Sequence, residues 1–181
     1  MAASAQSSVS YRWAVPSDCD VLGKIMFAAI HADPSPYTRA ERQAWCPQPP
    51  GGVEWEAKLA KQYVAVAVGP YGDLHTEQEK NPQLMGMMTM TSEGYLDLAF
   101  LLPNARGKGH LRRLLSMIRA QASELDLPAL TTHASLAAQT PFGALGFELV
   151  KQEVVTRHGQ SLRRAEMRLP LKTTGRDRQF R

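Results

Sequence analysis

The sequence predicts a mixed α/β domain, in which a mostly antiparallel sheet of six to seven strands is flanked by helices. The central observation is an almost continuous apolar run at 95–102, ended by Pro103, which indicates a buried strand. Two shorter apolar runs, 63–68 and 84–91, precede it and complete an antiparallel meander. A helix follows, because its apolar residues recur every three or four positions on one face: Leu111, Leu114, Leu115 and Ile118.

The remaining elements follow from the same kinds of pattern, in chain order. Toward the N-terminus the sequence predicts a strand at 9–15, a helix from a Ser17 or Asp18 cap to about His31, a short helix from Thr38 to Trp45, and another at 54–61. Toward the C-terminus it predicts a strand at 129–134, a short helix from a Ser135 cap to a Gly146 C-cap, and a hairpin of 148–156 and 163–169.

The chain of 181 residues is long enough for one domain with a full core. We expect residues 1–8 to be disordered, 9–171 to form the domain, and 172–181 to be a basic, flexible tail. The polar loop at 69–83 is unusually long, which predicts a mobile segment or an extended hairpin tip. The sequence shows no internal repeat and no second domain.

The net charge of +4 comes mainly from that tail. Residues 171–181 hold four basic side chains and one acidic one, 4 − 1 = +3, which leaves +1 for the rest. A nucleic-acid-binding domain would carry its basic residues on the fold itself, so we expect no nucleic-acid partner. No stretch is apolar enough to cross a membrane and no signal peptide is recognisable, so we expect a cytoplasmic protein with no membrane partner. Cys19 and Cys46 are expected to be reduced thiols, and no metal-ligand spacing is present.

A basic loop with two glycines separates the central strand from the helix: Arg106-Gly107-Lys108-Gly109-His110. Glycines allow the backbone to approach a ligand closely, and the free amides at a helix start attract phosphate. Arg106 and Lys108 add positive charge, so the loop is a candidate pyrophosphate site. Its spacing matches neither a Walker loop nor a dinucleotide fingerprint, so a basic surface turn remains the alternative.

This loop resembles the acetyl-CoA-binding motif of the GNAT N-acetyltransferase superfamily, Arg/Gln-x-x-Gly-x-Gly/Ala, at Arg106 and Gly109. Leu111 departs from the motif, and its larger side chain is expected to move the helix or crowd the cofactor. The resemblance implies that the pyrophosphate of acetyl-CoA binds the loop residues Arg106, Gly107, Lys108, Gly109, His110 and Leu111. It also implies that the preceding strand diverges from its neighbour and binds the pantetheine arm through backbone groups of Phe100, Leu101 and Leu102.

A second resemblance runs from Thr131-Thr132-His133-Ala134-Ser135 through Pro141-Phe142-Gly143-Ala144-Leu145-Gly146-Phe147. It implies that Ser135 and Phe142 line the cofactor site. Many GNAT enzymes carry a tyrosine general acid at the position of Phe142, so that role cannot be transferred to this chain. Together the motifs cover about 11–171 and imply a GNAT fold whose parallel strand pair is 95–102 and 129–134.

The proline-rich section at 32–52 resembles a small bacterial subgroup of the superfamily, with a tyrosine, a short helix and an Ala-Trp-x-Pro sequence. In the superfamily this region forms one wall of the acceptor pocket. The resemblance therefore makes Tyr37 and Trp45 substrate-binding candidates. The alternative is that Trp45 is simply a core residue.

Catalytic candidates lie on the central strand. Alternation places Tyr95, Asp97 and Ala99 on one face, and Asp97 is a carboxylate in a strand that otherwise looks buried. We expect Asp97 to bind or deprotonate an amine, with Tyr95 as a second candidate; the alternative for Asp97 is an ion pair with a neighbouring strand or exposure at a strand end. His110 and His133 lie nearby, but a lone histidine is more often structural, and the ring of His110 is expected to point into solvent.

The resemblance implies acetyl transfer from acetyl-CoA to a primary amine of a small molecule or peptide, directly within a ternary complex and without a metal. The expected partners are that amine and acetyl-CoA, with a homodimer as a further possibility. A rival interpretation is a non-catalytic acyl-CoA-binding or regulatory module on the same fold. Leu111 and Phe142 favour the rival, and Asp97 opposes it.

Overall fold

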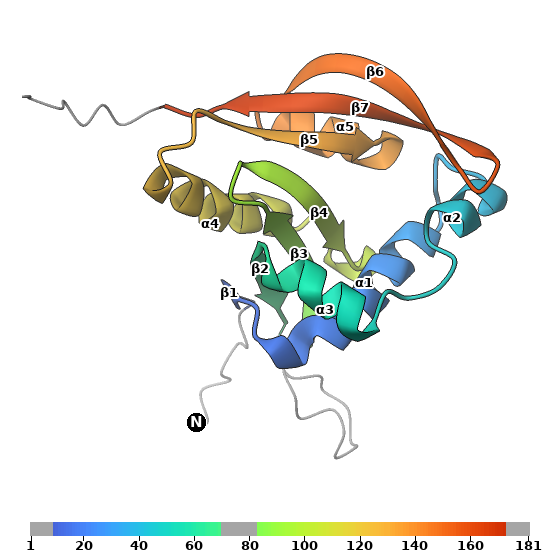
Figure 1. The fold of residues 1–181 in the computed structure, drawn as a ribbon, viewed down its shortest axis with the longest axis horizontal. Coiled ribbons are helices and arrows are strands. Elements are labelled where there is room, and N and C mark those ends of the chain that lie inside the picture. Colours follow the sequence, from blue (N-terminus) through green and yellow to red (C-terminus); the bar gives the residue numbers. More distant parts are fainter. Residues whose placement is uncertain (1–8, 70–82, 173–181) are drawn as a thin grey trace, which may run out of the picture.

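A computed structural model describes residues 9–69 and 83–172. The N-terminus at 1–8, most of the 69–83 loop and nearly all of the basic tail therefore lie outside the described residues, together with the predictions made for them. The described chain forms a seven-stranded sheet flanked by helices (Figure 1), which confirms the predicted fold class. No helix within the described ranges is both long enough and apolar enough to cross a membrane.

The sheet has the strand order β1-β2-β3-β4-β5-β7-β6. The first four strands form a meander, and β5 pairs with the C-terminal hairpin of β6 and β7. Among the described strands, β4 and β5 are the one parallel pair, as predicted, and helix α4 connects them. The strands are β1 (Ser10–Trp13), β2 (Tyr63–Val68), β3 (Leu84–Met90), β4 (Tyr95–Leu101), β5 (Ala129–Ser135), β6 (Glu148–Arg157) and β7 (Gln160–Pro170).

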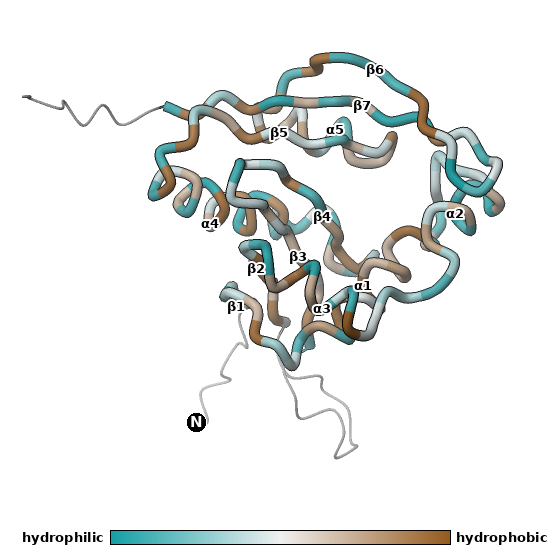
Figure 2. The backbone as a smooth tube through the Cα atoms, viewed as in Figure 1, coloured by the Kyte–Doolittle hydropathy of each residue, from teal (hydrophilic) through white to brown (hydrophobic). Residues whose placement is uncertain are grey.

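Helices cover both faces of the sheet (Figure 1). On one face the apolar stripe of α4 is buried, including Leu114 and Ile118, and it packs with Phe142 of α5. On the other face α1 and α3 form a second core around Leu22 and Trp55. Figure 2 shows hydrophilic residues along α2 and stretches of β6 and β7, at the margin of the molecule. The helices are α1 (Cys19–His31), α2 (Arg39–Trp45), α3 (Gly52–Ala60), α4 (His110–Glu124) and α5 (Leu136–Ala144).

The two predicted N-terminal helix caps have different outcomes. Thr38 caps α2 as predicted: its hydroxyl accepts the Glu41 amide at 3.2 Å, and the Glu41 carboxylate accepts the Thr38 amide at 2.7 Å. Asp18 precedes α1, but its carboxylate accepts the Val15 amide at 2.8 Å and binds Arg12 at 2.7 Å. The hydrogen bond from Arg12 lowers the pKa of Asp18 although burial opposes it, so Asp18 fixes the turn between β1 and α1 instead of capping helix amides.

A β-bulge interrupts the middle of β4. Met88 of β3 pairs with Ala99, whereas Met90 pairs with Leu96, so two β4 residues lie opposite Thr89. The buried hydroxyl of Thr89 accepts the Leu98 amide at 3.0 Å, which satisfies this backbone donor at the irregular position. The predicted common face therefore holds for Tyr95 and Asp97, which line one cavity, but is wrong for Ala99, which packs on the α4 side.

The bulge assigns β4 side chains to different faces of the sheet. Leu96 packs on the α4 side, whereas Leu98, only two residues later, belongs to the core beneath α1 and α3. Strict alternation cannot anticipate this shift, because the extra residue advances the side-chain period by one position.

Replacing Thr89 with valine is expected to destabilise the fold by about 1–3 kcal/mol, because the buried Leu98 amide loses its acceptor while the side-chain volume is kept. Equilibrium denaturant unfolding measures the difference. Thr131→Val is the matched control on β5, since no side-chain hydrogen bond of Thr131 is present among the described residues, and it should change the free energy by less than about 0.5 kcal/mol. Equal effects of the two variants would show that the Thr89 hydroxyl does not support the bulge.

Candidate active site

The parallel strands β4 and β5 separate soon after they meet. They pair at two positions, Tyr95 with Thr131 and Leu96 with Thr132, and the buried Thr132 hydroxyl donates to the Leu96 carbonyl at 2.9 Å. Beyond this point Figure 1 shows the two strands diverging. A cavity of about 470 Å³ lies along the separated part of β4, where it is bordered by Ala99, Phe100 and Leu101.

The basic loop forms one end of this cavity. Gly107 and Gly109 have left-handed backbone angles, with φ of 73° and 81°, and no atom beyond the adjacent residues lies within 4 Å of where a Cβ would stand on either residue. Gly109 is the N-cap of α4 and its carbonyl accepts the Arg113 amide, so the amides of the first helical residues have no intrahelical partner. The three residues that follow Gly109 all line the cavity: His110, Leu111 and Arg112.

The two basic side chains of the loop differ in position. Arg106 lines the cavity, and its guanidinium donates to the Ala29 carbonyl at 2.8 Å, which ties the loop to the C-terminal turn of α1. Lys108 is exposed and is not among the lining residues. Leu102, which was predicted together with Phe100 and Leu101, also lies outside the lining and packs toward the α1 core.

His110 corrects a sequence expectation. Its ring is buried, not turned into solvent, and its Nδ1 shares a hydrogen bond of 2.7 Å with the Tyr11 hydroxyl of β1. This contact joins the start of α4 to β1, 99 positions earlier in the chain. Leu111 is half-buried, lines the cavity and packs against the α4 core, so the side chain at the departing motif position lies partly in the core.

Phe142 and Ser135 border the same cavity from the β5 side. Phe142 is buried and packs edge-on against Phe147, with ring centroids 4.9 Å apart. Ser135 occupies the N-cap position of α5, but its hydroxyl makes no capping hydrogen bond, contrary to the prediction.

Tyr37 performs the capping that Ser135 does not. Its buried hydroxyl accepts the Leu136 amide at 2.9 Å and donates to the Arg163 carbonyl of β7 at 2.5 Å. Burial raises the pKa of this phenol. Trp45 stands edge-on to Tyr37, 5.6 Å between ring centroids, and its ring is 6.2 Å from that of Phe100. Trp45 is half-buried, and both aromatic residues line the cavity.

A second cavity of about 170 Å³ adjoins the first, and the two share Tyr37, Trp45, Phe100 and Ser135. The predicted catalytic residues Tyr95 and Asp97 line the second cavity. Asp97 forms an ion pair, but with a helix residue instead of a neighbouring strand: its Oδ2 contacts Lys58 of α3 at 2.8 Å and accepts the Gln62 side-chain amide at 2.8 Å.

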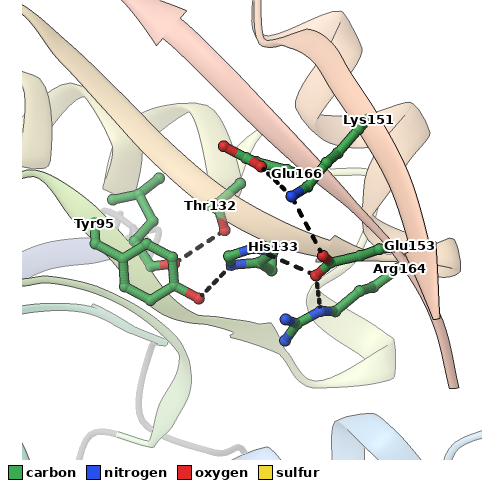
Figure 3. Close-up of polar contacts among 8 residues, drawn as sticks. Tyr95, Thr132, His133, Lys151, Glu153, Arg164 and Glu166 are labelled. Carbon is green, nitrogen blue, oxygen red and sulfur yellow. Dashed lines mark hydrogen bonds and ion pairs between the residues drawn. The ribbon is translucent and has the colours of Figure 1, made fainter. Parts of the chain in front are cut away.

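Tyr95 is the first member of a polar chain that crosses from β4 to β7 (Figure 3). Its hydroxyl bonds to His133 Nδ1 at 3.0 Å, and His133 Nε2 faces the Glu153 carboxylate of β6 at 3.4 Å. The same carboxylate oxygen accepts a hydrogen bond from Arg164 Nε. Burial raises the pKa of Tyr95, and the nearby Asp97 charge adds to this effect. Desolvation raises the pKa of Glu153, but the contacts with Arg164, His133 and Lys151 outweigh it and lower the value.

Sequence reasoning identified residues that line both cavities but missed the hydrogen bonds and ion pairs that connect Tyr95 and Asp97 to other elements. It treated His133 as an isolated histidine, and it missed Lys58, Glu153 and Arg164. The one available signal was the alternation within β5, which places His133 on the same face as Thr131, the partner of Tyr95. The acidic and basic partners come from segments with no local pattern that indicates a site.

The diverging parallel strands and the glycine loop at a helix start are the features that the resemblance to the GNAT superfamily implied, and the comparison with protein families agrees. The family model for the acetyltransferase (GNAT) domain matches residues 71–169. The chain therefore belongs to the GNAT acetyltransferase family. No curated protein sequence matches it significantly.

Several solved structures share the fold. A GCN5-related N-acetyltransferase from Rhodopseudomonas palustris is 21% identical, with a TM-score of 0.76, over 91% of this chain and 97% of that chain. A putative acetyltransferase from Salmonella typhimurium, solved with acetyl-CoA, is 21% identical, with a TM-score of 0.59, over 91% of this chain and 95% of that chain. A phosphinothricin acetyltransferase from Sinorhizobium meliloti, in complex with acetyl-CoA, is 22% identical, with a TM-score of 0.61, over 90% of this chain and 88% of that chain. At these identities the likeness concerns the fold.

Replacing Tyr37 with phenylalanine is expected to lower the free energy of unfolding by about 1–3 kcal/mol, because the Leu136 amide and the Arg163 carbonyl both lose their partner. Denaturant unfolding followed by tryptophan fluorescence measures the change. Tyr63→Phe is the control, since no hydrogen bond of the Tyr63 hydroxyl is present within the described residues, and it should stay within about 0.5 kcal/mol of the parent. A Tyr37 variant as stable as the parent would contradict the bracing role.

Proposed function

We propose that the chain transfers the acetyl group of acetyl-CoA to a primary amine of a small molecule or peptide, directly within a ternary complex. The observation that best supports this proposal is that two cavities adjoin. One ends at the free amides of a helix start, and the other is lined by titratable side chains. Membership of the GNAT acetyltransferase family supports the reaction type. The acetyl-CoA present in two of the similar structures supports the choice of donor.

The first cavity suits the elongated donor substrate. In the proposal, the amides that follow Gly107 and Gly109 and the Arg106 guanidinium bind the pyrophosphate. The edge of β4 beyond Leu96 has left its parallel partner, so backbone groups near Phe100 and Leu101 are available to an extended pantetheine arm. Lys108 contributes charge from outside the cavity, and Leu102 supports the strand.

The proposed reaction requires a neutral amine. The acceptor ammonium first loses one proton, and its nitrogen then attacks the thioester carbonyl carbon. A C–N bond forms, the C–S bond breaks and CoA leaves as a thiolate. The nitrogen loses a second proton as the amide forms, and the thiolate takes up one proton, so the products are an N-acetyl amide and CoA. Holding both substrates in adjoining cavities provides the proximity that this step needs.

The chain from Tyr95 to Glu153 is the proposed proton acceptor. Because a carboxylate can only accept hydrogen bonds, Glu153 favours an N–H at His133 Nε2, which leaves Nδ1 to accept the proton of the Tyr95 hydroxyl. The phenol oxygen can then receive a proton from the amine while its own proton passes to His133. In this arrangement Asp97 orients the ammonium through Oδ1, since Lys58 and Gln62 both contact Oδ2.

The departing thiolate receives no proton from residue 142, because phenylalanine has none to give. A CoA thiolate can leave without a dedicated general acid, because the pKa of a thiol is low enough for the thiolate to depart unprotonated. The same replacement favours the second candidate function, a non-catalytic acyl-CoA-binding module. That alternative keeps the donor cavity and gives the polar chain a structural role only.

The first test is calorimetric titration with acetyl-CoA, with ATP as a control ligand. Arg106→Ala is expected to weaken acetyl-CoA binding about tenfold or more, because one charge-assisted contact to the pyrophosphate is lost. Lys108→Ala is the matched variant on the same loop, and we expect an effect below about threefold that disappears at high salt, since the residue acts only through its charge.

The comparison between the two loop variants separates the alternatives for this loop. Equal, small effects of both substitutions would indicate a basic surface turn. Absence of acetyl-CoA binding by the parent protein would overturn the proposed function itself.

His133→Gln is expected to lower kcat for amine acetylation by about 100-fold while leaving acetyl-CoA affinity unchanged, because the amide side chain preserves polarity but cannot accept a proton. Steady-state release of the CoA thiol measures the rate. His31→Gln is the control, since His31 lines neither cavity and bonds to the Cys46 carbonyl, and it should stay within about twofold. Activity that survives in His133→Gln would exclude the relay and leave Asp97 as the remaining candidate.

A further inference from the structure

The second cavity differs from the first in its charge. Side chains on its lining include Lys58, Arg157 and Arg164 as cations and Asp97 as the anion. Arg163 also borders it, but its carbonyl accepts from Tyr37 and strand alternation directs its side chain to the opposite face from Arg164. Arg163 is therefore left out of the charge count.

Two of these cations already have carboxylate partners. Lys58 pairs with Asp97 at 2.8 Å, and Arg164 binds Glu153 through Nε. Within the described residues no acidic side chain lies within ion-pair distance of Arg157. Alternation along β6 places Arg157 on the same face as Val155 and Glu153, which is the cavity side. One positive charge on this face is therefore uncompensated.

Arg164 retains donors for a ligand. A guanidinium has five N–H groups, and the contact with Glu153 uses Nε. Figure 3 shows the terminal guanidinium nitrogens extending past Glu153 in the direction of Tyr95. The charge of Arg164 acts on the Tyr95 phenol, which agrees with this direction. The planar fork of an arginine matches a carboxylate, with which it forms two parallel hydrogen bonds.

From this arrangement we propose that the acceptor amine carries an anionic oxygen group, most simply a carboxylate, which binds Arg164 and Arg157. The inference rests on the proposed acetyl transfer and names its substrate class: an amino acid or another acidic amine. With the carboxylate on the arginines, the nitrogen of a short amino acid lies toward Tyr95 and Asp97, where the proposed proton transfer begins. Purely cationic acceptors, such as polyamines, meet Lys58, Arg157 and Arg164 and are repelled.

The test compares acceptors that differ only in this charge. Amino acids are assayed as acceptors at saturating acetyl-CoA, each both as the free acid and as the amide of its carboxyl group. Release of the CoA thiol is followed. The best free acid is expected to exceed its own amide at least about tenfold in kcat/KM, the size of one charge-assisted contact. Dipeptides, in which the carboxylate stands farther from the amine, distinguish a free amino acid from a peptide N-terminus as its source.

Arg157→Gln is the main variant, because Arg157 is exposed and its loss does not disturb the Glu153 contact. It should lower kcat/KM for the free acid about tenfold and leave the amide within about twofold. Arg168→Gln on β7 is the matched control, since Arg168 is exposed and does not line the cavity, and it should leave both substrates unchanged.

The outcomes separate the inference from the proposed function. Acetyl-CoA binding together with equal acetylation of acids and amides, or a preference for amides or polyamines, would overturn the inference and leave acetyl transfer standing. Loss of acetyl-CoA binding would remove the proposed function and the inference with it. A preference for free acids that persists unchanged in Arg157→Gln would also contradict the assignment.

Discussion

The hydrogen bond between the Thr89 hydroxyl and the Leu98 amide is the constraint on which the site depends. It stabilises a bulge, as a result of which Leu96 faces one core and Leu98, two residues later, faces the other. Two residues earlier the parallel pairing with β5 stops, and the cavity opens along the edge that β4 no longer shares. The irregular pairing with β3 and the end of the pairing with β5 thus lie within a few residues of each other on β4, next to the cavity.

Local patterns in the sequence were sufficient for the strands and helices. The limits of β2 agree with the predicted 63–68, and Thr38 and Glu41 form the expected capping box, because these features depend on residues close together in the chain. The bulge, the Tyr37 contacts and the pairing of His133 with Glu153 were beyond prediction. Each joins residues from distant segments, and no periodicity encodes where a hydroxyl or carboxylate from another strand will lie.

The resemblance reached further than the patterns, with defined limits. It assigned Phe100, Leu101, Arg106 and Phe142 to one cofactor site, and all four line the first cavity. Tyr37, which it assigned to the acceptor wall, lines both cavities. The resemblance also included Lys108 and Leu102, which lie outside the lining of the first cavity, and gave no information on the basic residues of β6 and β7. Residues carried by a motif follow the shared fold, whereas Arg157 and Arg164 of the second cavity lie on the C-terminal hairpin, in segments that no quoted motif covers.

The hydroxyl of Tyr37 has a consequence for the order of folding. It joins residues 99 and 126 positions away in the chain, Leu136 and Arg163, and Tyr37 itself lines both cavities. Contacts of such long sequence separation form late, because the loop entropy between them must be lost first. During synthesis the glycine loop can emerge and fold with α4, but the wall between the two cavities is completed only after β7 has left the ribosome. Cotranslational intermediates of this chain therefore contain the glycine loop and α4 before they contain the complete second cavity.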